Sequence, residues 1–413
     1  MRAIARRRHL GENELGIELN HLLQISLGAI LAAPAAAAAG QTPAAQDGLR
    51  QSALALEQKG KSAEAEAAWR AIAKAHPASP EAYAHLGLLE ARQEHYKEAI
   101  PFYRKALELG PQIPSVKLNL GLALFKAGDL KDSIGVFEPL LKSDPGNQQV
   151  TTLIGMAYYG LAKYSEAAPY LKDAAAHDPK SLPLRLALAH SYLWSKQYQN
   201  VLDVYHEMLS LDPDSAEADM LAGEALDEMR DSAGAILQFR AAVKANPKEP
   251  NAHFGLGYLL WTEKRYAEAV PEFQAELDND PIHIQALLYL GDSQIQMNRF
   301  ETARPLLERV VKMNPEIGLG HLDLGIVYSE AQHNDDALKE MSLAAQLMPE
   351  DVNAHWRLGR LYRTLGRIDE AKVEFDKASK LNKAANDDLH NKIANAHPRP
   401  PETQPAPAAP DGK

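Results

Sequence analysis

The sequence predicts an all-α protein, a solenoid of ten stacked 34-residue helix–turn–helix repeats. Three features of equal period support this prediction. A proline recurs once per repeat, a glycine precedes it at a constant separation, and a column of small residues lies between the two. The prolines are Pro77, Pro111, Pro145, Pro179, Pro213, Pro247, Pro281, Pro315 and Pro349. The glycines are Gly87, Gly121, Gly155, Gly223, Gly257, Gly291, Gly325 and Gly359, with Ala189 breaking the column. The period contains no insertion or deletion, so ten repeats occupy residues 46–385.

Each repeat is expected to form two amphipathic helices. His321, Leu324, Gly325 and Tyr328 have the i, i+3, i+4, i+7 spacing of one helix face, and the second half of each repeat has a face of its own. A short break separates the two helices, and it often contains Gly or Asn. An Asp-Pro or Asn-Pro pair frequently ends the repeat, because the residue before proline avoids the helical region. The glycine and alanine columns let two helix axes approach closely, so we interpret them as packing contacts and not as catalytic loops.

The residues in these columns resemble those of the tetratricopeptide repeat family. The resemblance rests on the Leu-Gly pairs that begin at Leu86, Leu120, Leu256, Leu290, Leu324 and Leu358, on Tyr158, Tyr192, Tyr328 and Tyr362, and on the aromatic residues Trp69, Tyr103, Phe137, Tyr205, Phe239, Phe273 and Phe375. It covers residues 46–385, about four-fifths of the chain. The resemblance implies a right-handed superhelix whose concave groove binds a partner.

Composition excludes several classes of protein. The chain has 413 residues and no cysteine, so disulfides, thiolate metal sites and cysteine nucleophiles are absent. Its net charge of −11 disfavours binding to a nucleic acid backbone. We find no metalloprotease, nucleophile-elbow or phosphate-loop motif. His253, His321 and His355 share one repeat column, and residues at equivalent places of different repeats need not converge on one ion. The sequence therefore predicts no catalytic residue, no metal site and no cofactor.

The two ends of the chain differ from the repeats. Residues 1–39 contain four arginines, an apolar run and an alanine tract, which resemble a secretory signal peptide, and 40–45 form a short linker. We therefore expect an exported, periplasmic or extracellular protein with no stable membrane span after cleavage. An uncleaved anchor, a misassigned start and a cytoplasmic protein are the alternatives. Residues 386–397 are compatible with a further capping helix, and the Pro/Ala-rich segment 398–413 is expected to be a disordered tail.

A binding surface is expected on the first helix of each repeat. Ala84, Leu88 and Ala91 mark the face that the resemblance assigns to the concave groove. Along the chain this face carries large apolar, aromatic and charged side chains, which usually mark a binding site. The predicted partner-binding residues are Phe125, Met156, Tyr159, His190, Trp194, Phe254, Tyr258, Trp261, Trp356, Arg360 and Arg363. The alternative is that some of them pack between adjacent first helices.

A mixed aromatic, acidic and Trp-Arg surface suits an extended peptide, with aromatic anchors and charges that set the register. We therefore expect a non-enzymatic protein-protein interaction scaffold that binds a peptide or partner protein. The alternative is a glycan-handling accessory protein of exopolysaccharide export, whose aromatic rings stack on an oligosaccharide. Self-association through the terminal repeats is a further alternative. An enzyme is not expected, because the residues after 385 are too few to fold as a catalytic domain.

Overall fold

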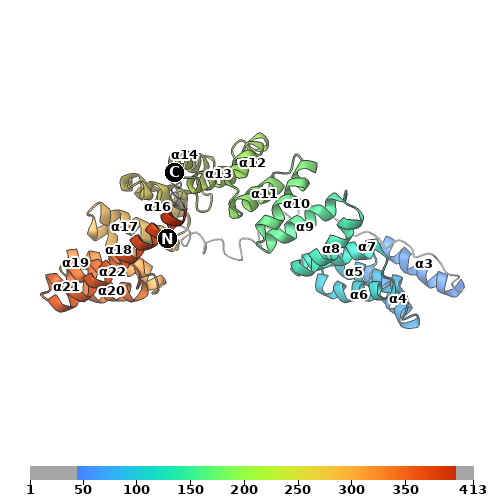
Figure 1. Cartoon of the computed structure of the whole chain (residues 1–413). Coiled ribbons are helices and arrows are strands. Elements are labelled where there is room, and N and C mark those ends of the chain that lie inside the picture. Colours follow the sequence, from blue (N-terminus) through green and yellow to red (C-terminus); the bar gives the residue numbers. More distant parts are fainter. Residues whose placement is uncertain (1–43, 397–413) are drawn as a thin grey trace, which may run out of the picture. The chain divides into compact units, whose positions relative to one another are not determined.

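The computed structural model describes residues 44–396, with side chains from 48 to 388, and this part of the chain forms twenty α-helices and no strand (Figure 1). It divides into an N-terminal unit that ends at Ala245 and a C-terminal unit that begins at Asn246. The first helices of the repeats in the N-terminal unit are α3 (Ala44–Gln58), α5 (Pro80–Arg92), α7 (Pro114–Lys126), α9 (Gln148–Gly160), α11 (Leu182–Trp194) and α13 (Ala216–Glu228). Their second helices are α4 (Ser62–Ala75), α6 (Tyr96–Leu109), α8 (Leu130–Ser143), α10 (Tyr164–His177), α12 (Tyr198–Leu211) and α14 (Ser232–Ala245). The C-terminal unit contains the first helices α15 (Ala252–Thr262), α17 (Ile284–Gln296), α19 (Gly318–Glu330) and α21 (Val352–Thr364), and the second helices α16 (Tyr266–Asn279), α18 (Phe300–Met313), α20 (Asn334–Leu347) and α22 (Ile368–Ala396).

Within each unit, every helix packs against the next helix in the chain. Several first helices also contact the first helix of the following repeat, as α9 does with α11 and α17 does with α19. This layered arrangement is an α-solenoid, so the predicted fold class is confirmed. The right-handed sense of the superhelix stays a prediction.

Side-chain caps define where many of the first helices begin. The residue before the helix accepts a hydrogen bond from the backbone N–H three residues later, which satisfies one donor that lacks a partner inside the helix. These capping residues are Ser79, Asn147, Ser181, Ser215, His283 and Asp351. They are separated by one or two whole repeat periods, so the period fixes the helix starts.

The glycine column marks the closest contacts between the two helices of a repeat. A Cβ atom on Gly121 would lie 2.4 Å from Cε1 of Phe137, and one on Gly257 would lie 2.8 Å from Cε1 of Phe273. Side chains at these positions would overlap the fully buried aromatic ring of the second helix. The interpretation of the glycines as packing contacts is confirmed.

The turn between the two helices of a repeat has a left-handed residue at the same position throughout the described array. Its φ is positive at Gly60, Glu94, Gly128, Ala162, Lys196, Arg230, Lys264, Asn298, Gln332 and Gly366, each one repeat period after the previous one. In the repeat of α5, the N–H groups of Glu94 and His95 donate to the carbonyls of Ala91 and Glu90, at 3.1 and 3.0 Å. This pattern is a common C-terminal cap, in which glycine is the usual left-handed residue. The sequence reveals the break where it contains Gly or Asn, but not where it contains Glu, Lys or Arg.

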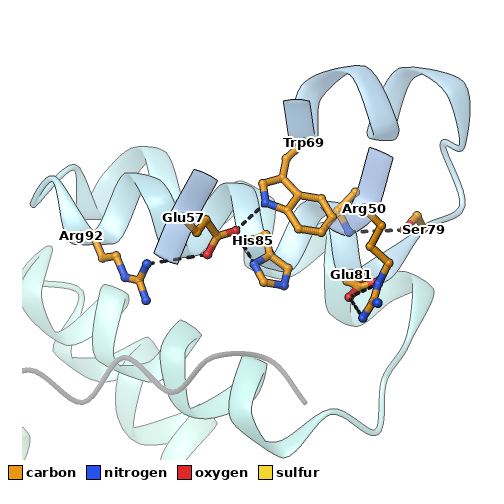
Figure 2. Close-up of polar contacts among 8 residues, drawn as sticks. Arg50, Glu57, Trp69, Ser79, Glu81, His85 and Arg92 are labelled. Atoms are coloured by element: carbon orange, nitrogen blue, oxygen red, sulfur yellow. Dashed lines mark hydrogen bonds and ion pairs between the residues drawn. The ribbon is translucent and has the colours of Figure 1, made fainter. Parts of the chain in front are cut away.

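A buried polar cluster joins the first three helices (Figure 2). Glu57 of α3 accepts a hydrogen bond from the indole Nε1 of Trp69 in α4, at 2.5 Å. The same carboxylate lies 2.7 Å from Nδ1 of His85 in α5, and the Trp69 and His85 rings stack with centroids 4.2 Å apart. Arg92 Nη1 lies 3.7 Å from the other oxygen of Glu57. We call Glu57, Trp69 and His85 the Glu57 cluster, and it fixes α3, α4 and α5 to one another.

Histidines of the shared repeat column contact carboxylates within their own repeats. Nδ1 of His321 lies 2.5 Å from Glu340, and Nδ1 of His355 lies 2.5 Å from Glu374. The second ring nitrogen of His355 lies 3.0 Å from the carbonyl oxygen of Pro349. Both nitrogens of the His355 ring therefore have a protein partner, and these histidines connect the first and second helix of a repeat.

Residues 1–43 and 397–413 lie outside the described part of the chain, and with them the expected signal peptide, most of the linker and the Pro/Ala-rich tail. The segment in which a further capping helix is expected, 386–397, does not form a separate element. Through Ala396 it continues α22, which is a single helix of 29 residues. No helix in residues 44–396 is long and apolar enough to cross a membrane.

Candidate functional site

Four aromatic side chains gather on the first helices of the C-terminal unit. Phe254, Tyr258 and Trp261 lie along α15, and Tyr289 faces them from α17. The Tyr289 ring is 4.9 Å from Trp261 and 5.2 Å from Tyr258, in edge-to-face geometry. Tyr258 also stacks on Trp261 at 5.9 Å. All four are half-buried, so this aromatic cluster of α15 and α17 presents apolar surface in a fixed arrangement.

The start of α15 is held by a carboxylate from α16. Glu276 accepts hydrogen bonds from the backbone N–H groups of Asn251 and Phe254, at 3.2 and 3.0 Å. Asn251 has a φ of 63°, and its side-chain oxygen lies 3.1 Å from Nε2 of His283. Burial raises the pKa of Glu276, while the two N–H donors act in the opposite direction. The cap places Phe254 against the His283 ring, with centroids 4.8 Å apart.

Asp292 of α17 orients the indole of Trp261. Its Oδ2 accepts a hydrogen bond from Trp261 Nε1 at 2.5 Å, and its Oδ1 accepts one from Gln296 Nε2 at 3.1 Å. Asp292 is only 8% exposed. A buried carboxylate with two donors restricts the ring to one orientation, so the anchor is ordered before any partner arrives.

A second carboxyl group lies near Asp292. Asp323 of α19 is buried, and its Oδ2 has no hydrogen-bond partner among the described residues. Burial raises the pKa of Asp323 well above its usual value; the negative charge of Asp292 adds to the shift, and Arg357 of α21 opposes it. Burial also raises the pKa of the nearby Tyr289 phenol. This part of the surface therefore disfavours a further negative charge.

We expect Asp323→Asn to change how stability depends on pH. The folded protein holds the Asp323 proton more tightly than the unfolded chain does, so the unfolding free energy falls as pH rises above about 4. The slope for one proton is at most about 1.4 kcal/mol per pH unit. Asparagine cannot ionise, so the variant should gain stability relative to the parent as pH rises above about 4.

Urea unfolding at several pH values measures this difference. The exposed Asp278→Asn serves as control, because Asp278 bonds only to the exposed Gln274. If the difference in unfolding free energy between Asp323→Asn and the parent chain stays constant with pH, the raised pKa of Asp323 is contradicted.

The final first helix presents a basic and aromatic surface. Trp356 of α21 is 43% exposed, and the guanidinium of Arg360 lies 4.9 Å from its ring centroid. Arg363 lies over the Phe375 ring at 5.6 Å. Arg360 and Arg363 are both exposed. We call Trp356, Arg360 and Arg363 the basic face of α21.

A smaller aromatic group lies in the N-terminal unit. Trp194 of α11 stacks on Tyr164 of α10 at 6.1 Å, and both rings are half-buried. His190 lies 3.2 Å from the Glu217 carboxylate of α13. Two of the predicted residues, His190 and Trp194, thus lie at accessible positions in this unit.

Three predicted binding residues are buried, and their assignment to an accessible surface is wrong. Phe125, Met156 and Tyr159 are each 2% exposed and belong to the hydrophobic core of the N-terminal unit. The Tyr159 ring contacts Tyr164 of α10 and His190 of the neighbouring first helix α11, which agrees with the alternative that some of these residues pack against adjacent first helices. Side chains that are removed from solvent in this way contribute to the stability of the core.

The sequence interpretation did not identify Tyr289, Asp292 or Asp323. Asp292 lies one repeat period after Tyr258, so it occupies a column that contains predicted binding residues. Tyr289 and Asp323 occupy another column, which also contains His85 and Asn119. These residues could have been found in the sequence as polar residues in repeat columns that are mostly apolar. In the part of the chain that the structure describes, no group of three or more His, Asp or Glu side chains has the arrangement of a metal site.

Comparison with known proteins agrees with the repeat analysis. Three family models, each described as tetratricopeptide repeat, match the chain. The first matches residues 50–114 and 220–281, the second matches 90–157 and 260–318, and the third matches 352–384. Together the matched residues cover more than half of the chain. The two-helix repeats define an α-solenoid repeat protein. The chain belongs to the tetratricopeptide repeat family. No curated protein matches it.

Solved structures with partial similarity include other repeat arrays. MamA 41-end from Desulfovibrio magneticus RS-1 is 21% identical with a TM-score of 0.38, over 41% of this chain and 96% of that one. YrrB, described as a TPR protein with an unusual peptide-binding site, is 18% identical with a TM-score of 0.38, over 46% of this chain and 97% of that one. A chain of the Cut9-Hcn1 hetero-tetramer is 13% identical with a TM-score of 0.41, over 85% of this chain and 90% of that one.

Proposed function

We propose that this chain is a non-enzymatic interaction scaffold that holds an extended peptide or a segment of a partner protein on its first helices. The main support is the aromatic cluster of α15 and α17. Its rings are half-buried, mutually packed and fixed by Asp292 and Glu276. Ordered aromatic anchors bind with a smaller loss of side-chain entropy than mobile ones do.

The geometry of the rings favours a peptide over a sugar. Tyr258 stacks on Trp261, and Tyr289 packs its edge against both rings. A sugar ring stacks on an open aromatic face, whereas an apolar peptide side chain also packs against ring edges. No observation on the described surface favours the glycan-handling alternative.

Photo-crosslinking tests the proposal directly. We would place benzoylphenylalanine at Gln296, an exposed position of α17 that is hydrogen-bonded to Asp292. The control carries it at Lys312, an exposed position on the second helix α18. Partner peptides should crosslink at Gln296 and not at Lys312, and Trp261→Ala should reduce the yield about tenfold or more because aromatic anchors dominate binding. Equal labelling at both positions, or labelling of carbohydrate alone, contradicts the proposal.

We also propose that the protein is exported, on the basis of the arginines and the apolar and alanine runs within residues 1–39. Intact mass measurement of the native protein tests this. A species that begins near Gly40 in the exported fraction supports export. A full-length cytosolic species contradicts it and leaves an intracellular scaffold.

A further inference from the structure

The helix α21 is positively charged, whereas the whole chain has a net negative charge. The protein has 44 basic and 55 acidic residues. Nevertheless, the thirteen residues of α21 contain Arg357, Arg360 and Arg363 and no Asp or Glu. Arginines three residues apart on a helix repel one another unless an anion lies nearby. Carboxylates on another part of the protein or on another molecule would therefore stabilise these arginines.

The described part of the protein does not provide this counter-charge for Arg360 or Arg363. Among the described residues, no carboxylate lies within ion-pair distance of Arg360 or Arg363. Other arginines of this unit do have such partners, because Arg367 lies 2.8 Å from Glu370 and Arg265 lies 2.7 Å from Glu268. Arg360 and Arg363 contact aromatic rings instead. Their guanidinium groups remain available for a carboxylate of another molecule.

Trp356 adds an apolar anchor to these charges. It is a large aromatic side chain with 43% of its surface exposed, in a chain whose other described tryptophans are buried or half-buried. Exposed tryptophan beside arginine is the composition found at the energetic centres of protein interfaces. Arg360 lies over the ring of Trp356, so that face is not open for a sugar ring to stack on.

We propose that the basic face of α21 binds an acidic segment of the partner protein. Trp356 packs against an apolar side chain of that segment, and Arg360 and Arg363 pair with its carboxylates. The inference rests on the proposed scaffold function and specifies the chemistry of its partner. Because the pairs form at an exposed surface, binding weakens as ionic strength rises.

Fluorescence anisotropy of the full chain tests the proposal. The probe is a fluorescein-labelled synthetic peptide rich in Asp and Glu with a central Leu, and its comparison peptide has Lys in place of the acids. The double variant Arg360→Gln/Arg363→Gln should bind the acidic peptide about tenfold more weakly, because it loses two charged contacts. The matched control is Arg367→Gln, which removes a neighbouring arginine that is already paired with Glu370. It should bind like the parent chain. Circular dichroism confirms that each variant is folded.

The outcomes separate this inference from the scaffold proposal. Binding of the acidic peptide that falls with salt and in the double variant alone supports the inference. Absence of binding at low salt, equal loss in Arg367→Gln, or binding only of a polyuronate oligosaccharide overturns it. If a protein partner crosslinks at Gln296 and binds the double variant as tightly as the parent, the scaffold function stands and this inference fails.

Discussion

Glu57→Ala is expected to lower the free energy of unfolding of the N-terminal repeats by about 3 kcal/mol, because it leaves buried polar groups without their partner. The carboxylate accepts from Trp69 Nε1 and lies 2.7 Å from His85 Nδ1 (Figure 2). The Trp69 and His85 side chains are 1% and 3% exposed, so the lost acceptor is not replaced by contact with bulk solvent. The removed side chain also leaves a gap between α3, α4 and α5.

Urea unfolding followed by tryptophan fluorescence measures the effect, since Trp69 itself lies in the Glu57 cluster. Glu57→Gln keeps an acceptor oxygen and should recover part of the loss. The control is Glu64→Ala, which removes an exposed carboxylate paired only with Lys61 and should change stability by less than about 0.5 kcal/mol. Similar unfolding curves for Glu57→Ala and Glu64→Ala would show that the cluster does not stabilise the end of the array.

Gly121→Val is the second change with a large expected effect, and we expect it to destabilise the chain by about 3 kcal/mol through overpacking. Its Cβ would lie 2.4 Å from the ring of Phe137, which is fully buried in the core of the N-terminal unit. The ring belongs to a core cluster of buried residues that also contains Ile154, so it has little room to move aside. The helices α7 and α8 must separate, and the contacts of α8 with α9 weaken in turn.

Gly135→Ala provides the matched control. Gly135 lies in the middle of α8, is exposed, and has nothing within 4 Å of the position of a Cβ atom. Alanine there should stabilise the helix by about 0.5–1 kcal/mol through lower backbone entropy in the unfolded chain. Opposite signs for the two substitutions in thermal and chemical unfolding would confirm the packing account. Tolerance of valine at Gly121 would mean that the helix pair adapts.

The repeat architecture can be predicted from the sequence because some positions of the repeat accept only one kind of residue. Only a small residue fits opposite Phe137 or Phe273. The repeating proline lies in the turn after the second helix, because the residue before a proline avoids the helical conformation. Each column therefore leaves a pattern that recurs in almost every repeat. Left-handed turn residues such as Lys264 leave no such trace. Their conformation is enforced by the two packed helices and not by the residue type.

The binding surface is less predictable for a physical reason. A first helix is covered by its own second helix and by helices of adjacent repeats, so apolar residues occupy most of its circumference. Helical periodicity therefore cannot separate the buried Tyr159 from the half-buried Tyr258, although both belong to the face predicted to bind. Likewise, the pairing of Trp261 with Asp292 depends on packing between two repeats, since these side chains lie 31 residues apart in the chain.

The left-handed turns carry a local backbone cost wherever the residue is not glycine. Seven of these turns have a residue other than glycine, and a side chain in that conformation costs about 1 kcal/mol. Ala162→Gly would remove this cost in the repeat of α9 and α10. Because each repeat of a solenoid stabilises mainly its neighbours, such a change would slow hydrogen exchange locally and not along the whole chain. The local stability of a single repeat can thus be raised by changing the residue in its turn.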